Sequence, residues 1–236
     1  MRRIAIGLLV WVALLPTPLI ACTFCGGGVA ARQTLREHFQ QAKFVACGQL
    51  KNPRFDPNGA ASTTEFHISQ IIKQHEKLGN QSVLTLPKYN PVIGNTTPDF
   101  LIFATVVDGK LDPVHGLPTS PNLIDYVKSL GHLDEKNAPK QLAFFFTHLD
   151  SSDPTIAADA FLEFAKATDA DITMARTVFV PAKLRKLLAN LDTPIERLGV
   201  FAMMLGLCGS TEDQLAFSKL LQTQPLSDRI RDNLGG

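Results

Sequence analysis

DFLIFATVVDG, residues 99–109, is the stretch that decides the fold of this 236-residue chain. Its first nine residues are almost all apolar, a pattern typical of a strongly buried strand. Asp108 and Gly109 then predict a tight hairpin turn, because both residue types accept the positive φ angles of such a turn. The segment therefore predicts a buried antiparallel strand that ends in a hairpin. Residues 112–118, DPVHGLP, are expected to form a loop that carries His115.

Three other strand patterns come before this segment. Residues 43–50, 61–73 and 82–86 are apolar or alternating, and the last two are separated by the turn signal Leu78-Gly79-Asn80. Short strands separated by turns are typical of antiparallel barrels, so residues 43–118 are expected to form a barrel-like unit. A helical pattern that begins at Thr34 precedes the first strand.

After Pro121 the periodicity becomes helical and no strand pattern is found. A first helix is expected to run to about Leu130, capped by Ser120 or Asn122. The other expected helices cover residues 139–149, 153–167, 180–191, 192–209 and 210–224. Asp153 and Asp192 each come just before a proline near a helix start, where an acidic cap and a first-turn proline are both favoured.

Two of these helices resemble each other. When Ile156 is aligned with Ile195, Asp153 falls on Asp192 at an offset of 39 residues. A period near 40 residues is typical of HEAT-type repeats, in which stacked helix pairs bury a shared apolar face. The helices are therefore expected to form either a short HEAT-like array or part of a longer one.

The N-terminus has the layout of a secretory signal peptide. Two arginines are followed by an apolar run over residues 4–15, and then by Pro16 and Pro18. The apolar run is too short to cross a bilayer, which takes about 20 residues. Residues 1–21 are therefore expected to be a signal peptide, and the mature chain is expected to begin at Cys22.

Leu19-Ile20-Ala21-Cys22 resembles the lipobox of bacterial lipoproteins, in which the cysteine is alkylated by diacylglycerol and becomes the first residue. Ala21 would also suit an ordinary signal peptidase, but Leu19 suits that enzyme poorly, so the pattern favours lipidation. A lipidated Cys22 would hold the protein on a membrane. The expected location is the periplasm or the membrane surface of the bacterial envelope.

The cysteines are Cys22, Cys25, Cys47 and Cys208, and export permits a bridge between two of them. Cys25 could pair with Cys22, in a small and strained ring, or with Cys47 if Cys22 is lipidated. The alternative is a thiol–disulfide oxidoreductase that uses Cys22 and Cys25. A redox pair of that kind lies between a strand and a helix, whereas three glycines follow Cys25. Cys208 is expected to be a small buried apolar residue.

Asp159 and Arg197 lie on otherwise apolar helices. Because a buried charge persists only when it is paired, they are expected to form a structural ion pair between neighbouring repeat units. His115 near Asp112 could act as a base, but a solvated loop histidine is the favoured interpretation. The chain lacks nucleotide-binding, zinc-protease and serine-hydrolase motifs, so we expect no catalytic site, cofactor or metal. The net charge of +1 makes a nucleic-acid partner unexpected.

The chain resembles a family of uncharacterised bacterial exported proteins. The resemblance rests on CTFC at 22–25, where the family usually has C-P-F-C, and on AKFVACGQL at 42–50. The strand–turn–strand segment at 66–86 also resembles the OB-like barrels of netrin-type modules, and residues 153–167 and 197–209 resemble the helical half of the family. Thr23 stands where proline is usual. The resemblance implies that the protein is exported and that an OB-like barrel is followed by a helical half. It implies no activity.

The expected fold class is α+β. An OB-like antiparallel β-barrel with an N-terminal helix would occupy residues 22–120, and an all-α HEAT-like repeat domain would occupy residues 121–236. Helical arrays offer extended surfaces that suit protein partners. The expected function is therefore non-enzymatic scaffolding or protein interaction in the envelope, with a membrane contact through a lipid on Cys22.

Mass spectrometry of the mature N-terminus tests the role of Cys22. We expect cleavage after Ala21 and a diacylglyceryl adduct on Cys22, because the lipobox makes this cysteine the new N-terminal residue. An alkylated sulfur cannot exchange with a disulfide, so the adduct would exclude a redox role for Cys22. A free thiol of low pKa at Cys22, together with reductase turnover, would instead support the oxidoreductase.

Overall fold

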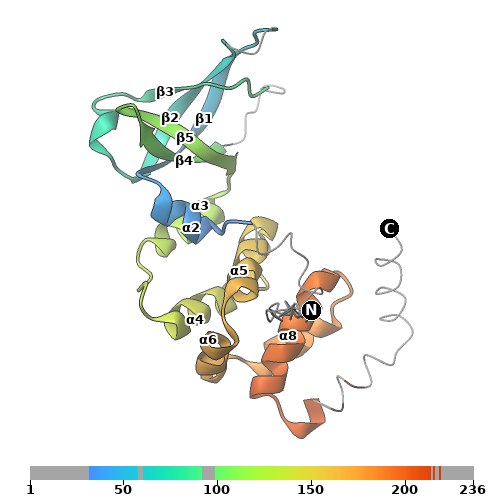
Figure 1. Cartoon of the computed structure of the whole chain (residues 1–236). Helices are drawn as coiled ribbons and strands as arrows, with labels where there is room; N and C mark the ends of the chain where they lie inside the picture. The colour runs from blue at the N-terminus through green and yellow to red at the C-terminus, as the bar shows by residue number, and fades with distance from the viewer. Residues whose placement is uncertain (1–31, 58–60, 92–98, 214, 216–217, 219–236) are drawn as a thin grey trace, which may run out of the picture.

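The protein is described by a computed structural model over residues 32–57, 61–91, 99–213, 215 and 218. Helix α2 (Leu35–Gln41) precedes strands β1 (Phe44–Arg54), β2 (Thr63–Lys73), β3 (Val83–Leu86), β4 (Asp99–Val107) and β5 (Lys110–Pro118), with the 3-10 helix η1 (Glu76–Leu78) between β2 and β3. The remaining elements are α3 (Pro121–Leu130), α4 (Ala138–His148), α5 (Pro154–Lys166), α6 (Asp169–Met174), the 3-10 helix η2 (Ala175–Val178), α7 (Pro181–Ala189) and α8 (Ile195–Cys208). The chain is mixed α+β, with the sheet at one end and α2 and α3 lying between it and the other helices (Figure 1).

The five strands form one antiparallel sheet in the order β3-β2-β1-β4-β5. β4 covers the residues that the apolar run predicts, and its central pairing with β1 sets Leu101 opposite Cys47. Asp108 and Gly109 have φ angles of 49° and 74° in the turn to β5, as a tight hairpin requires. The sheet is open, and β3 and β5 are its edge strands.

The expectation of a loop at residues 112–118 is wrong, because these residues belong to β5. Pro113 cannot donate a hydrogen bond and Gly116 has a low strand propensity, so the sequence has the composition of a loop. β5 tolerates both residues because it is an edge strand. Its register is irregular beside Pro113, and Val114 is 58% exposed at this bulge.

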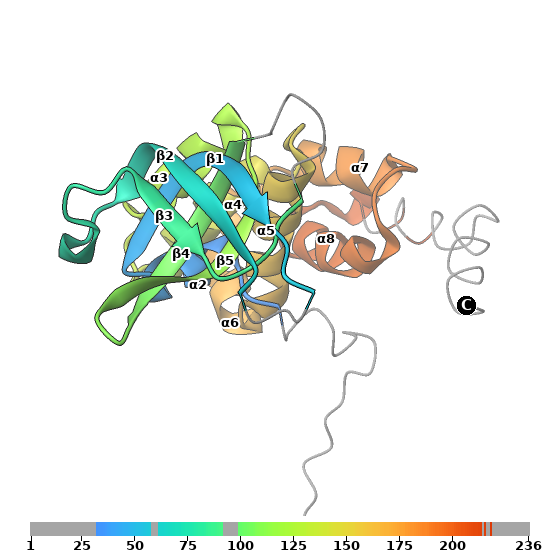
Figure 2. The ribbon, with the colours of Figure 1, turned by 90° about the horizontal axis from the view of Figure 1, so that it is seen from above.

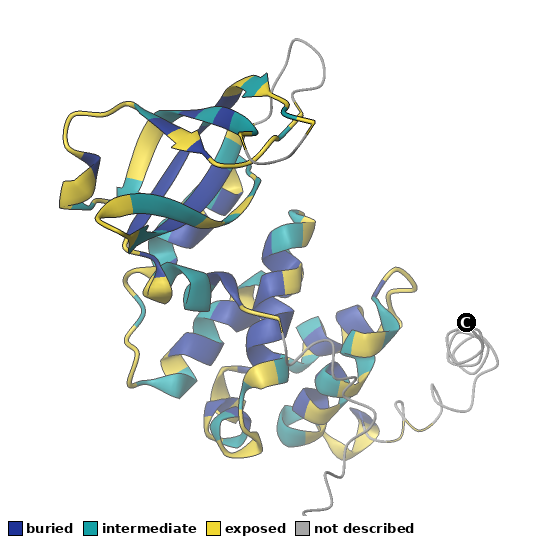
Figure 3. Ribbon diagram, turned by 45° about the horizontal axis from the view of Figure 1, so that its top comes forward, coloured by how far each residue is buried: buried dark blue, intermediate teal, exposed yellow. Residues whose placement is uncertain are grey.

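Alternate residues of the central strands enter two hydrophobic clusters. Phe44 and Ile102 belong to a cluster on one face of the sheet, which Leu78 of η1 also joins. Val45 and Leu101 lie in the cluster of the helical half, on the other face. The middle of the sheet is therefore buried (Figure 3), which explains why β1 and β4 are continuous apolar runs rather than alternating ones.

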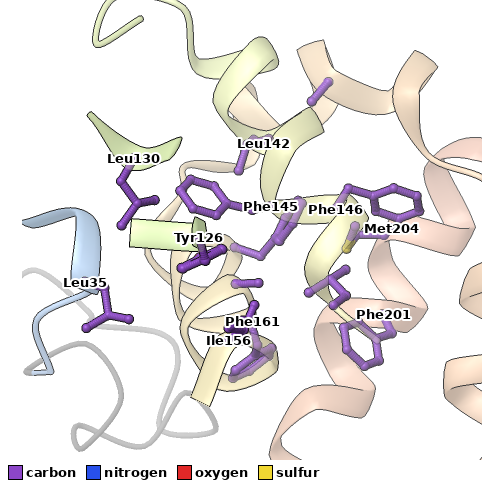
Figure 4. Close-up of a cluster of buried hydrophobic side chains, with 14 of the residues drawn as sticks. Leu35, Tyr126, Leu130, Leu142, Phe145, Phe146, Ile156, Phe161, Phe201 and Met204 are labelled. Carbon is purple, nitrogen blue, oxygen red and sulfur yellow. The ribbon is translucent and has the colours of Figure 1, made fainter. Parts of the chain in front are cut away.

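The second cluster joins the sheet and the helices in one core. It includes Leu35 of α2, Tyr126 of α3, Phe145 of α4, Phe161 of α5 and Met204 of α8 (Figure 4). Helix α5 is the central element, since eight of its thirteen residues are buried. The change from strand to helix falls at the expected position after residue 120, but the core continues across it.

Most helix starts follow the capping signals of the sequence. Thr34 and Glu37 form a reciprocal capping box at the start of α2, and Ser120 caps α3. Asp153 caps α5 as predicted. The corresponding prediction for Asp192 is wrong, because the N-cap position of α8 is taken by Pro194, which has no side-chain acceptor.

Helices α4 and α5 pack together, as do α7 and α8, and α5 contacts α8. Figure 2 shows α7 and α8 extending beyond the area that the sheet covers. The 39-residue alignment sets Ala160 on Gly199 and Phe164 on Met203, but the α5 residue of each pair is buried and the α8 residue is exposed. The two helices therefore have different environments, and the HEAT-like repeat stays a prediction.

The segment between α5 and α7 differs from the sequence pattern, which does not predict α6 or η2. The expected helix at 210–224 lies largely outside the described residues. Among the helices of the described ranges, none has the length and apolar character needed to cross a membrane.

The close approach of β2 requires a glycine at position 48 of β1. A Cβ at this position would lie 2.1 Å from the carbonyl oxygen of His67 and 2.9 Å from the ring of Phe66. Gly48→Ala is therefore expected to lower the free energy of unfolding by about 3 kcal/mol or more, because the strands must separate. Urea unfolding followed by circular dichroism measures this loss.

Gly116→Ala on β5 is the matched control. Its Cβ would meet the side chain of Ile102 and the carbonyl of Leu101 at 3.5 Å, an ordinary van der Waals distance. We expect a change within about 0.5 kcal/mol, as for most substitutions away from special features. Equal losses in the two variants would contradict the close contact at Gly48.

Candidate functional site

Charged side chains on one face of α5 hold the first turn of α2. This α5–α2 clamp consists of Asp159, Glu163 and Lys166 of α5 with Leu35, Arg36 and Glu37 of α2. The three α5 residues share a face because they are spaced four and then three positions apart. The clamp fixes α2 at the place where the chain enters the sheet.

Asp159 is the buried centre of the clamp, with 6% of its surface exposed. Its carboxylate accepts hydrogen bonds from the backbone N–H of Leu35 and from the hydroxyl of Tyr126, each at 2.7 Å. The Leu35 N–H is one of the donors that a helix start leaves without an intrahelical partner, so Asp159 acts as a second cap for α2. Burial raises the pKa of Asp159 to about 6, and burial followed by the charge of Asp159 raises the pKa of Tyr126.

Glu163 and Arg36 form a bidentate ion pair next to Asp159. The guanidinium donates from Nε and Nη2 to the two carboxylate oxygens, at 2.7 to 3.0 Å, and Glu163 is 4% exposed. Sequence analysis missed this pair. Its signal was the spacing of Asp159, Glu163 and Lys166 on an otherwise apolar helix, which places three charges on one face.

The other end of α2 is held by the sheet. Lys73 of β2 donates from Nζ to the carbonyl oxygens of Phe39 and Ala42, at 2.9 and 2.6 Å, which satisfies acceptors at the helix C-terminus. His38 of α2 stacks on His115 of β5 with ring centroids 4.0 Å apart. Burial lowers the pKa of both imidazoles, and for His38 the charge of His115 adds to this effect.

His115 is therefore a packed strand residue and not the solvated loop residue that the sequence predicts. No hydrogen bond joins it to Asp112 within the described part of the chain. The stacked arrangement uses the ring faces of both histidines for packing. The geometry thus supports a structural contact between α2 and the sheet rather than a catalytic base at this position.

The predicted ion pair between Asp159 and Arg197 is not formed. Asp159 takes its partners from Leu35 and Tyr126 instead, and the Arg197 guanidinium lies over the ring of Phe161, 5.4 Å from its centroid. The buried Nε of Arg197 has no hydrogen-bond partner in the structure. The prediction was right that Asp159 is buried and paired, but its partners come from elements far away in the sequence.

Arg197 lines a cavity of about 390 Å³ at the junction of the two helix pairs. The wall is formed by the α4–α5 connection, α5, α7, the α7–α8 connection and α8. Leu149, Ala157, Leu187 and Phe201 supply apolar surface, and polar groups of both connections reach the rim. The volume falls within the range of about 300–1,000 Å³ that is typical of small-molecule sites.

The described cysteines are free. Cys47 is 2% exposed on β1, and burial raises the pKa of its thiol. Its predicted partner, Cys25, lies outside the described residues, so the bridge to Cys47 stays a prediction. Cys22 and Cys25 lie outside the described residues, so their pairing stays a prediction. Cys208 is free and half-buried at the end of α8, less buried than expected.

An exposed apolar strip marks the segment between α6 and α7. We define it as Met174, Val178 and Val180, which are 58%, 36% and 52% exposed. Ala175 and Phe179, in the same segment, are buried and fix it to the core. Exposed apolar side chains that form a contiguous patch are typical of protein–protein contact sites, and these three lie within seven residues of one another.

The comparisons with known proteins add no functional assignment. No protein-family model matches the chain. No curated protein shows significant similarity to it. Over the described residues, no group of three or more histidine, cysteine, aspartate or glutamate side chains is placed to hold a metal ion. The candidate sites are therefore the cavity beside Arg197 and the exposed apolar strip.

The raised pKa of Asp159 predicts a pH dependence of stability. Its pKa of about 6 in the folded chain lies above the ordinary value of 3.8, so the folded state disfavours the ionised form. This contribution to stability is fully present below pH 3.8 and is lost as the pH rises through 6. It amounts to about 3 kcal/mol over that interval.

Asp159→Asn removes this titration while keeping an acceptor for the Leu35 N–H. The difference in free energy of unfolding between wild type and variant, measured by urea unfolding at pH 4 and pH 7, is expected to shift by about 2.4 kcal/mol in favour of the variant at pH 7, because part of the effect is already lost at pH 4. His38 and His115 are present in both proteins and cancel in the difference. Asp125→Asn, at an exposed position of α3, is the control and should show no such shift. A difference that is independent of pH would contradict the assignment.

Proposed function

We propose that this chain is an exported, non-catalytic protein that binds a protein partner in the bacterial envelope and is held at the membrane through Cys22. The observation that carries the proposal is the exposed apolar strip of Met174, Val178 and Val180. Three large apolar side chains within seven residues lose contact with water when a partner covers them, and this burial favours association.

The core explains how such a surface would work as a scaffold. One hydrophobic cluster runs from the sheet through α2, α3 and α5 to α8, so the strip is fixed relative to the rest of the chain. A binding surface that is already ordered loses little conformational entropy when the partner binds. This rigidity favours a role in positioning a partner.

In this proposal the β unit is an OB-like barrel. All five strands contribute to the cluster on the inner face of the sheet, with Leu50, Phe66, Leu84 and Ile102 buried and Leu111 of β5 packed against them. A flat sheet would keep the edge strands β3 and β5 far apart, whereas a curled one brings them to a common core. The packed pairs α4/α5 and α7/α8, with α5 touching α8, fit a HEAT-like array.

Export and anchoring rest on the N-terminal sequence and on the resemblance to C-P-F-C proteins of the bacterial envelope. The oxidoreductase alternative rests on Cys22 and Cys25, and no feature of the described residues favours it. The proposed function therefore depends on the strip, which can be changed without touching either cysteine.

Two substitutions replace the two most exposed residues of the strip and are compatible with the helix ends at which they lie. Met174→Lys places a positive charge at the C-terminus of α6, and Val180→Asp places a capping carboxylate at the N-cap of α7, and both changes suit those positions. We expect the double variant to fold with wild-type stability and to lose a defined envelope complex. A partner that covers the surface would then have to remove water from two charged side chains, which costs free energy. Native gel electrophoresis of envelope fractions, with quantitative mass spectrometry of the complex, measures the loss.

Val114→Lys on β5 is the matched control, because Val114 is as exposed as Met174 but lies on the sheet. The complex should persist in this variant. A complex that survives the double substitution, or a wild-type chain that migrates only as a monomer, would contradict the proposed function.

A further inference from the structure

The cavity between the two helix pairs combines an apolar wall with one cation. Leu149, Ala157, Leu187 and Phe201 form apolar surface, and Arg197 contributes a guanidinium. Sites of this composition, largely apolar with a few placed polar groups, are typical of small-ligand binding. The exposed apolar strip does not contribute to this cavity, so the two features can be tested separately.

Arg197 has the properties of a binding residue rather than of a structural one. Its guanidinium rests on the face of Phe161, which is itself buried and in edge-to-face contact with Phe201. This contact holds the guanidinium through the ring face rather than through a hydrogen bond. The buried Nε has no hydrogen-bond partner, an unusual condition for a buried polar atom in a folded protein. A bound anion that reaches this guanidinium would change the surroundings of the buried N–H.

The charges around the cavity favour an anion with a single negative charge. Lys186 lines the same cavity and adds a second cation. No side chain caps the N-terminus of α8, but Glu196 in its first turn already places a negative charge there, so the two cations rather than the helix dipole favour an anion. Asp150 and Asp192 lie at the rim, and Asp150 is already paired with Lys183. Two nearby carboxylates would repel a dianion such as phosphate, whereas one carboxylate group can pair with Arg197 in the bidentate geometry that arginine prefers.

We propose that this cavity binds a monocarboxylate that carries a short apolar group, with the carboxylate on Arg197 and the apolar group against Leu187 and Phe201. A free organic acid and the C-terminal carboxylate of a peptide share this chemistry. The inference goes beyond the proposed function and does not depend on it, because none of its residues belongs to the exposed apolar strip.

Nuclear magnetic resonance on the full chain labelled with ¹⁵N provides a direct test. The Nε–H signal of Arg197 is assigned by its loss in Arg197→Gln, and sodium hexanoate is then titrated into the wild-type protein. We expect a saturable shift of this signal, with a dissociation constant in the millimolar range or tighter. 1-Hexanol has the same apolar chain without the charge and should bind more weakly. Equal binding of the alcohol, or no shift of the Nε–H signal with hexanoate, would overturn the proposal.

The variants separate recognition by Arg197 from general charge attraction. Arg197→Gln should weaken hexanoate binding by about ten- to a hundredfold, the loss expected for a charged hydrogen-bonded pair. Arg176→Gln removes an exposed arginine of η2 and should leave the affinity unchanged. Equal affinities of Arg197→Gln and wild type, or equal losses in both variants, would contradict the site. If Arg197→Gln fails to fold, the wild-type titration with hexanoate and hexanol decides the question alone.

The source of the carboxylate is distinguished by a second pair of probes. N-acetyl-Ala-Leu with a free C-terminus is compared with its C-terminal amide, which has the same side chain and no carboxylate. Tighter binding of the free peptide than of hexanoate assigns the site to peptide C-termini, and the reverse order assigns it to free organic acids. Binding of the amide as tightly as the acid would overturn carboxylate recognition.

Discussion

The contact between α5 and the first turn of α2 is the interaction on which the rest of the structure depends. Asp159 accepts the Leu35 N–H, and Glu163 takes the Arg36 guanidinium, so both charges of the ion pair and the helix start are satisfied together. At the other end of α2, Lys73 satisfies carbonyl groups and belongs to the sheet. A seven-residue helix is too short to be stable alone, so its two ends must be held. One end of α2 is held by α5 and the other end by β2. Helix α2 therefore fixes the sheet relative to the other helices.

The sheet in turn explains the most apolar segments of the sequence. An antiparallel sheet with one wet face produces alternating patterns, but β1 and β4 are covered by helices on one face and by the inner cluster on the other. Gly48 shows how tightly this arrangement is packed, since the backbone of β2 lies where its Cβ would be. The side chains of the central strands are therefore used for packing on both faces of the sheet. This leaves little room on β1 and β4 for polar catalytic groups.

Local sequence signals predicted the ends of helices and strands well where a single residue type strongly favours the local backbone conformation. Thr34, Asp153 before Pro154, and Asp108-Gly109 each mark a boundary that the structure confirms. β5 was missed because Pro113 and Gly116 resemble a loop, and only its edge position allows them. The partners of Asp159 could not be predicted, because the need for a partner follows from burial while its identity follows from which helix lies alongside. Leu35 is 124 residues away in the chain, and periodicity contains no information on such contacts.

Burial of charge also separates the two halves of the helical region. Asp159 in α5 has both of its oxygens occupied, whereas Arg197 in α8 rests on Phe161 and leaves its Nε without an acceptor. One aligned apolar pair shows the same contrast, since Phe164 is buried and Met203 is exposed, whereas Leu162 and its counterpart Phe201 are both buried. The cavity, the unpartnered Nε of Arg197 and the exposed apolar strip all lie beyond or beside α5, although exposed apolar side chains such as Phe55 and Val114 also occur in the β unit. Both proposed binding features therefore lie around α6 to α8, and the core shared by the sheet, α2 and α5 supports that part of the chain.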